Sequence, residues 1–301
     1  MSGGGIGRGE EGMILVNVLL FVAIASGILL LLISAEDSGL ERGLRMREAA
    51  RAQAIARGGE TSAVVALRRD LAVAPDADSR AEPWAALAET GAPIEGGSFD
   101  LVIADAQGRF NINGLMEEDP VAIGILGRIA AAVGMSDDQM KRAVAAIRAT
   151  GPVSDLRPLA AIGLEPARLA RLSGLVTALP YPSRINLNAA SEDMLAILTG
   201  DAMAAHRLVA IRDRQGYIAK GDLAGLRLTM PQGAGFASNM FWVRSRVRIG
   251  ETSQQLTSLI ARRDPPQEAS APAPAAPVAK RTEVIGRWTG ASAPLQAPPL
   301  P

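Results

Sequence analysis

The sequence contains no cysteine and only one histidine, His206, among its 301 residues. Without cysteine the chain can form no disulfide and can offer no thiolate to a substrate or to a zinc ion. His206 has no serine, aspartate or metal-ligand companion at a telling spacing, which favours an exposed or hydrogen-bonded helix residue. Aromatic residues make up only 3% of the chain, so the cores must be built mainly from Leu, Val, Ile and Ala.

The usual signatures of catalysis are also missing from the sequence. We find no carboxylate pair for acid–base chemistry, no glycine-rich phosphate loop and no nucleophile elbow. The chain is therefore not expected to be an enzyme or to hold a cofactor. Lys and Arg total 31, as do Asp and Glu, so the net charge favours neither a nucleic acid nor an acidic partner.

Two acidic groups could in principle ligate calcium, Glu117–Glu118–Asp119 and Asp137–Asp138. Carboxylate oxygens are the ligands that calcium prefers. Acidic residues at this density are also typical of the solvated first turn of a helix, where they complement the helix dipole. We favour helix starts and assign no metal ligands.

An uncharged apolar segment runs from Met13 to Ile33 and follows only twelve hydrophilic residues. About 20 apolar residues can span a bilayer as a helix, so residues 13–34 are predicted to be a transmembrane helix. A secretory signal peptide would have a basic start and a shorter apolar core. One arginine precedes the segment and several follow it, so the positive-inside rule alone would place the body of the chain in the cytoplasm.

The helical pattern continues past the apolar segment. Leu44, Ile55 and Leu67 lie among arginines and glutamates, which predicts an amphipathic stem helix over residues 35–74. Proline interrupts helices, so this one should end near Pro75.

Strand patterns occupy two distant stretches, 75–119 and 234–290. In the first, apolar residues alternate from Phe99 to Ile103, and the alternation resumes at Phe110 after the turn sequence DAQG, which predicts a hairpin.

In the second stretch, NMFWVRSRVRIG and QQLTSLIARR predict a hairpin that turns at IGET, and RTEVIGRWTG predicts one more strand. The Pro- and Ala-rich composition predicts a disordered loop over 264–280 and a disordered tail over 291–301.

Residues 120–233 read as a block of short helices inserted between the two strand stretches. Several segments begin with Ser or Asp and end in Gly, which are typical helix start and stop signals. The predicted fold class is α+β: a long N-terminal helix, an antiparallel sheet and a large inserted all-helical domain.

Residues 185–223 within this block resemble the helix-hairpin-helix module of DNA-uptake and repair proteins. In such a module a glycine hairpin lets backbone N–H groups approach phosphate oxygens at a helix N-terminus. Here only Gly200 of the hairpin glycines remains, and Asp201 would repel a phosphate. We therefore favour a structural role, and keep a membrane-tethered DNA-binding protein of the uptake class as the alternative function.

Two asparagine pairs share one form, Asn111 with Asn113 and Asn186 with Asn188. Asparagine favours caps and turns because its side chain bonds nearby backbone groups. We assign all four to structural caps or turns.

Several of these segments, taken in order, resemble the protein K family of the type II secretion system, which are minor pseudopilins. The likeness rests on the short leader before the apolar helix and on DAQGRFNING, SDLRPLAAIG, TALPYPSRINLNAAS and FWVRSRVRIG. The resemblance covers most of residues 8 to 263. It implies that the antiparallel sheet is pilin-like.

The resemblance implies that a prepilin peptidase cuts between Gly12 and Met13, leaving a leader of residues 1–12 and an N-methylated Met13. It also implies that Asn17 occupies mature position five, where most pilin-like proteins carry glutamate. An unpaired terminal ammonium is costly in apolar surroundings, so a subunit lacking that carboxylate suits the tip of the filament, with nothing above it.

The resemblance further implies a single-pass protein of the bacterial inner membrane with its C-terminal head in the periplasm. Its implied partners are the minor pseudopilins I, J and H, the major pseudopilin G, the inner-membrane assembly platform and the prepilin peptidase. Its implied role is structural, in the export of folded proteins across the outer membrane. Calcium is possible by resemblance, but the acidic segment of the family is not found in the corresponding stretch, RAVAAIRATGPVSDL.

Overall fold

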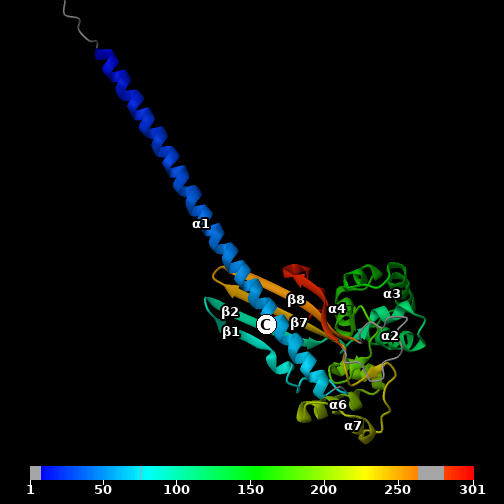
Figure 1. Ribbon diagram of the computed structural model, residues 1–301. Coiled ribbons are helices and arrows are strands. Elements are labelled where there is room, and N and C mark those ends of the chain that lie inside the picture. The colour runs from blue at the N-terminus through cyan, green and yellow to red at the C-terminus, as the bar shows by residue number, and fades with distance from the viewer. Residues whose placement is uncertain (1–7, 75, 264–280) are drawn as a thin grey trace, which may run out of the picture. The chain divides into compact units, whose positions relative to one another are not determined.

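The first element is a helix of 66 residues, α1 (Arg8–Val73), in a computed structural model that describes residues 8–74, 76–263 and 281–301 (Figure 1). The glycines of the stem, although glycine weakens helices, do not interrupt it. The predicted membrane segment and stem are therefore two parts of one helix. The first seven residues of the predicted leader, together with Pro75 and the predicted loop 264–280, lie outside the described residues.

The chain divides into two units, and the first comprises residues 1–51. The large apolar side chains of its helix are exposed, with Phe21 at 74% and Leu31 at 72%. By length and composition this helix can cross a membrane. Soluble proteins rarely expose so large an apolar surface, so this part of α1 is suited to an apolar medium.

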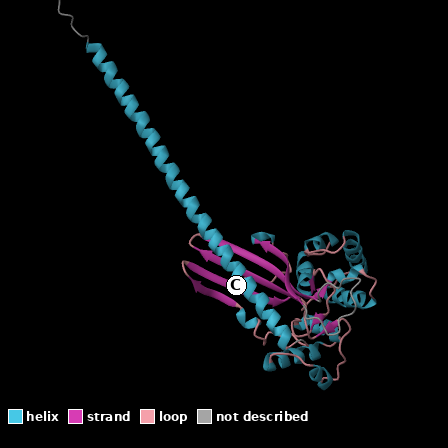
Figure 2. Ribbon diagram, in the orientation of Figure 1, coloured by secondary structure: helices cyan, strands magenta, loops and turns pink. Residues whose placement is uncertain are grey.

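The second unit, residues 52–301, contains a five-stranded antiparallel sheet in the order β1-β2-β7-β8-β9 (Figure 2). Its strands are β1 (Glu89–Ile94), β2 (Gly97–Asp105), β7 (Met240–Ile249), β8 (Thr252–Arg263) and β9 (Arg281–Thr289). The predicted β7–β8 hairpin is confirmed, since its register runs from Met240 opposite Ala261 to Ile249 opposite Thr252. Strands far apart in the sequence thus form one sheet.

The last part of α1 packs on this sheet through small residues. Ala52 and Ala56 lie in one cluster with Val247, and Ala63 and Leu67 lie in another beside Phe241. Helix and sheet come so close that a Cβ built on Gly59 would lie 2.8 Å from Cζ of Phe99. The small side chains, spaced to share one face of the helix, permit this approach.

The stretch between β2 and β7 is mostly helical, and its helices gather beyond one end of the sheet (Figure 1). They are α2 (Pro120–Val133), α3 (Asp137–Thr150), α4 (Pro166–Leu175), α5 (Glu192–Thr199), α6 (Ala202–Gln215) and α7 (Lys220–Gly225), with the 3₁₀ turns η2 (Ile112–Met116) and η3 (Arg157–Ile162). Ile129, Leu187, Met194 and Leu208 lie in their common core. The predicted α+β class, with a helical insertion in an antiparallel sheet, is confirmed.

The predicted hairpin after β2 is wrong. The segment following DAQG forms β3 (Phe110–Asn111), which pairs in parallel with β4 (Val176–Thr177) and not with β2. The partners of β2 are β1 and β7. Alternation alone could not reveal this, because it indicates a strand but not its neighbour.

The predicted free tail is also wrong. Residues 291–301 begin in η4 (Gly290–Ser292) and then lie along the folded unit, with Gln296 buried. Its Nε2 donates to the carbonyl oxygens of Ser154 at 2.9 Å and Ala178 at 3.2 Å. Arg244 donates to the carbonyl oxygen of Pro298 at 2.6 Å. Side chains of the folded unit thus hold a segment whose Pro-rich composition is typical of a loose end.

Candidate functional site

The proposed processing junction, Gly12–Met13, lies inside α1, near its start. Met13 is 62% exposed, and Asn17 lies one turn further along the same helix and is also exposed. Asn17 lies among the exposed apolar residues of this part of α1, and its side chain is an amide that carries no charge. The geometry places this amide where a neighbouring chain could meet it.

The first asparagine pair joins β3 to two later segments. Asn111 caps η2, with its Oδ1 accepting from the N–H of Asn113 at 3.2 Å, and the same oxygen accepts from the N–H of Leu179 at 3.0 Å. Asn113 accepts from the N–H of Val153 at 2.9 Å and donates to its carbonyl at 2.8 Å. The Asn111 side chain therefore makes both a local turn and a long-range connection, whereas the Asn113 side chain makes long-range connections.

The second pair repeats this arrangement in another place. Asn186 Oδ1 accepts from the N–H of Asn188 at 2.9 Å, and its Nδ2 donates to the carbonyl of Asp78 at 2.9 Å. Asn188 Oδ1 accepts from the N–H of Ile218 at 2.6 Å. The four asparagines thus fasten the helical insertion to itself and to the segment that follows α1.

In the helix-hairpin-helix-like segment, a side chain of the protein itself bonds the backbone N–H groups that would otherwise bind an anion. Gly200 ends α5 in the left-handed conformation with φ 72°, and Asp201 caps α6. The Asp201 carboxylate accepts from the backbone N–H groups of Met203 at 2.8 Å and Ala204 at 3.1 Å. These are the donors that a phosphate would need, so the chain's own carboxylate occupies them. This geometry counts against the DNA-binding alternative.

His206 lies on the surface of α6, with its side chain 68% exposed and its Nδ1 3.1 Å from Glu192. Of the acidic groups considered for calcium, three residues belong to helix starts, whereas Glu117 lies at the end of η2. Asp119 caps α2, and Asp137 and Asp138 lie in the first turn of α3. In the stretch RAVAAIRATGPVSDL, Asp155 pairs with Arg157 at 3.2 Å. Among the described residues, the acidic side chains that lie close enough together to share an ion are others, namely Asp70, Asp78 and Glu82.

A buried ionic cluster, which the sequence did not reveal, ties the end of α1 to β8. The guanidinium of Arg262 bonds Asp70 on α1 at 2.7 Å and also bonds Asp78 in the following loop. It lies 4.6 Å from the ring centroid of Phe241. Burial raises the pKa of Asp78 despite this cation.

Glu82 completes a group of three carboxylates with Asp70 and Asp78, whose ligand oxygens lie within 4.8 Å of one another. Burial, reinforced by the charges of the two aspartates, raises the pKa of Glu82 to about 7. Three carboxylates can hold a hard cation, but Arg262 already neutralises two of them here. A metal would have to displace a buried guanidinium, so the arrangement does not fit a metal site.

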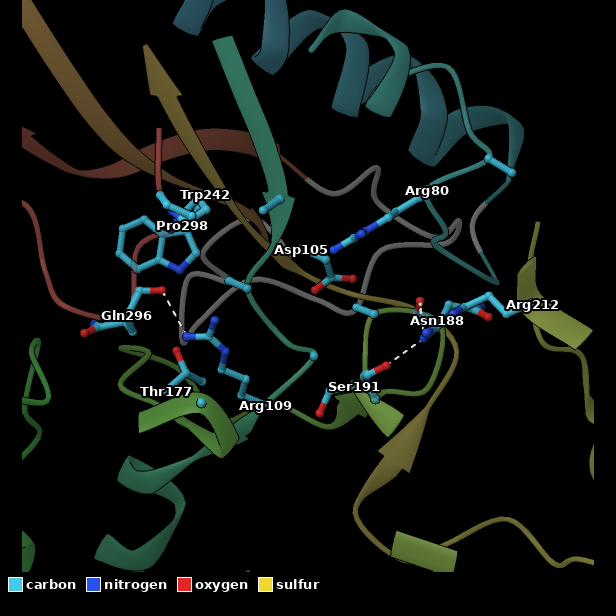
Figure 3. A pocket seen from close by; sticks show the side chains of 18 of the residues that line it. Arg80, Asp105, Arg109, Thr177, Asn188, Ser191, Arg212, Trp242, Gln296 and Pro298 are labelled. Atoms are coloured by element: carbon cyan, nitrogen blue, oxygen red, sulfur yellow. Dashed lines mark hydrogen bonds between the residues drawn. The ribbon is translucent and has the colours of Figure 1, made fainter. Parts of the chain in front are cut away.

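A cavity of about 670 Å³ opens where the end of β2, the insertion and the tail meet (Figure 3). Arg80, Arg109 and Arg212 line it, together with Asp105 and Trp242. Burial raises the pKa of Asp105 to about 6. Both Asp105 oxygens are engaged: one accepts from the N–H of Gln107, and the other from Asn186 and Ser238.

Comparison with known proteins gives a similar protein sequence and a similar solved structure. No family model matches the chain. The chain is 28% identical over 298 residues to type II secretion system protein K of Pseudomonas aeruginosa, covering 85% of this chain and 90% of the relative. The expected resemblance to that protein is thereby confirmed.

A solved structure shares the fold. A chain of the GspK-GspI-GspJ complex from the enterotoxigenic Escherichia coli Type 2 Secretion System superposes with a TM-score of 0.60. The sequences are 18% identical, and the match covers 83% of this chain and all of that chain, 100%. At this identity the likeness concerns the fold alone.

Proposed function

We propose that this protein, a relative of type II secretion system protein K, is a structural minor pseudopilin at the tip of the type II secretion pseudopilus. In that position it supports export of folded proteins across the outer membrane. It does so by assembly and not by catalysis, so it needs no cofactor. The proposal joins the sequence likeness to features of the helix and of the inserted domain.

The observation that carries the proposal is the two-part character of α1. Its first part exposes apolar side chains, as a single-pass membrane anchor does, while its last part is buried against an antiparallel sheet. One uninterrupted helix that serves as both anchor and core element is the pilin-like arrangement. In this proposal the anchor lies in the bacterial inner membrane and the head lies in the periplasm.

Position at the tip is supported by Asn17. A subunit above this one would bring a charged N-terminus into apolar surroundings, and the Asn17 amide, unlike a carboxylate, has no charge that could neutralise it. The insertion between β2 and β7 adds bulk at one end of the sheet, which would hinder a further subunit. By this proposal the partners are the minor pseudopilins I and J, and below them H and the major pseudopilin G.

Processing provides the first test. Full-length protein co-expressed with a prepilin peptidase and with the assembly platform should lose residues 1–12 and begin at Met13 with a methylated amine, as mass spectrometry of the N-terminal peptide would show. Gly12→Val should block the cut, whereas the matched variant Gly9→Val should leave it unchanged. A wild-type chain that keeps its leader beside an active peptidase contradicts the proposal.

Assembly provides the second test. Tagged full-length protein, solubilised from membranes that contain the other pseudopilins, should co-purify with I and J. The recovery of both should exceed that of the major pseudopilin G, because the tip contacts few copies of G. Recovery of G without I and J would contradict the tip position. Whether the protein belongs to the filament at all would then still depend on the processing test.

A further inference from the structure

The cavity described above has walls from four parts of the second unit that are distant in sequence. Arg80 follows α1, Arg109 follows β2, and Arg212 belongs to α6, while Gln296 and Pro298 of the tail close another side (Figure 3). Its volume of about 670 Å³ falls in the range of about 300–1,000 Å³ that is usual for ligand sites. The fold thus brings three guanidinium groups to one cavity.

These guanidinium groups retain donors for a ligand. A guanidinium has five N–H donors in a planar fork. In Arg109, Nη1 donates to the carbonyl oxygen of Gln296 at 3.3 Å. In Arg212, Nη1 donates to the carbonyl oxygens of Asn188 at 3.3 Å and Ala190 at 2.6 Å. Both side chains are therefore held in place by one terminal nitrogen, which leaves the rest of each fork for another group.

Carboxylate partners for these arginines are missing among the described residues. None of Arg80, Arg109 and Arg212 makes an ion pair there, whereas the buried or half-buried Arg148, Arg246, Arg262 and Arg263 do. Burial lowers the pKa of Arg109. Burial and, to a smaller extent, the charge of Arg80 lower the pKa of Arg212 against the opposing charge of Asp213. Positive charge is thus concentrated here, and in the part of the chain that the structure describes the carboxylates that also line the cavity form no ion pair with it.

Some of the described residues that line the cavity also carry buried side-chain atoms without a hydrogen-bond partner. Within the described chain, five buried side-chain atoms lack a hydrogen-bond partner, and three of them belong to residues that line this cavity. Two of these, the Thr177 hydroxyl and the Asn188 amide nitrogen, are donors. Buried polar groups are normally paired, but these atoms are fully covered, so an occupant of the cavity could reach them only if the wall rearranged.

The charges distinguish between possible anions. Three arginines line the cavity, and two carboxylates, Asp105 and Asp213, line it too. The excess is one positive charge, which matches a carboxylate better than a doubly charged phosphate. A carboxylate also has the two coplanar oxygens that a guanidinium fork binds in a bidentate manner.

We propose that this cavity is a binding site for a carboxylate group, held by Arg80, Arg109 and Arg212. The carboxylate comes either from a free organic acid or from an acidic side chain of a bound peptide. This site lies in the head, apart from the N-terminal features tested under the proposed function. The binding-site proposal can therefore fail while the proposed function holds, and the reverse.

The test uses full-length protein in detergent and four probes in ligand-observed NMR titrations. The probes are butyrate, the blocked peptide acetyl-Ala-Glu-Ala-amide, its neutral counterpart acetyl-Ala-Gln-Ala-amide, and inorganic phosphate. Saturable binding of butyrate assigns the site to free acids, and binding of the Glu peptide without butyrate assigns it to protein side chains. The Gln peptide and phosphate should bind more weakly than the probe that is bound.

Two variants locate the binding. Arg80→Gln and Arg109→Gln should each raise the dissociation constant about tenfold or more, because each removes a charge-assisted hydrogen bond. Arg207→Gln is the matched control, since Arg207 is exposed on α6 and does not line the cavity. It should leave binding within about twofold of the wild type.

Thermal unfolding of each variant separates lost binding from lost folding, and Arg80 is an exposed residue whose replacement should leave the fold intact. Any of three results would overturn the proposal: no saturable binding of either carboxylate probe, equal binding of the Gln peptide, or equal loss in Arg207→Gln. Tighter binding of phosphate than of both carboxylates would overturn it as well.

Discussion

Between Met13 and Ile33, the large side chains of α1 are exposed around the helix, whereas from Ala52 onward the same helix has a buried face made largely of alanine. The first part is the more apolar, yet it contributes no core to the protein. The second part carries many charges and forms the core under the sheet. Hydrophobicity along one helix therefore does not indicate which part stabilises the fold, since that depends on what covers it.

The largest difference in the free energy of unfolding is expected when an ion pair is removed from each of the two parts of α1. Arg262→Met leaves Asp70 and Asp78 buried without their cation, and we expect it to lower the free energy of unfolding by about 3–5 kcal/mol. Arg45→Met breaks a pair with Glu41 that is 69% exposed on both sides, and it should cost about 0.5 kcal/mol or less.

Denaturant unfolding of the full-length protein in detergent would measure both values. Equal effects of Arg262→Met and Arg45→Met would show that the buried cluster is not what holds the end of α1 to β8.

Leucine truncation tests the same contrast in apolar contacts. Leu67 is fully buried, at 0% exposure, whereas Leu30 is 67% exposed. Leu67→Ala should lower the free energy of unfolding of the head by about 2–5 kcal/mol, and Leu30→Ala should leave it unchanged. Circular dichroism of thermal unfolding would compare them. A destabilised head in Leu30→Ala would mean that the first part of α1 supports the core after all.

The acidic residues beside the end of α1 predict a dependence on pH. Burial raises the pKa of Glu82 from 4.5 to about 7 and that of Asp105 from 3.8 to about 6. The folded protein then binds protons that the unfolded chain has released, so stability falls as the pH rises through these values. Glu60 and Asp100 have lowered pKa values and stay ionised in this window.

We therefore expect a lower midpoint of thermal unfolding at about pH 8 than at about pH 5. Glu82→Gln should raise the midpoint at the higher pH and reduce the difference between the two. A midpoint that instead rises with pH would show that Glu82 is ionised without penalty.

The smallest effect concerns the tail. Gln296→Ala removes the bonds to Ser154 and Ala178, and should cost about 1–2 kcal/mol. Leu295→Ala is the matched control, because Leu295 is 60% exposed. Limited proteolysis should release the tail of Gln296→Ala first. Indistinguishable cleavage of the two variants would favour a tail that is not held by Gln296.

Much of the fold could be predicted from local patterns. The apolar run and the lack of prolines indicated α1, and the alternation on both sides of IGET indicated the β7–β8 hairpin. β1 was missed because ETGAPI contains glycine and proline and little of the β-branched and aromatic content that marks strands. Periodicity describes one segment at a time, so pairings such as β3 with β4 escape it.

The candidate sites depend on contacts between residues distant in sequence even more than the fold does. Arg262 meets Asp70 across 192 positions of sequence, and neither residue stands out in its own segment. Asp201 is the exception: the sequence showed an acid where a phosphate should bind, and the structure gives the reason, since the carboxylate caps α6. A site made of neighbours in sequence can be read from the sequence, and one assembled by the fold cannot.

The attachments of α1 to the sheet also determine how the head responds to pulling. Glu60 bonds Arg287 of β9 and Ser258 of β8, and Asp70 bonds Arg262 of β8. At about 1.5 Å per residue the two attachments lie about 15 Å apart along the axis. Tension along the end of the helix is therefore shared between two attachments, and both must break before this part of α1 can leave the sheet.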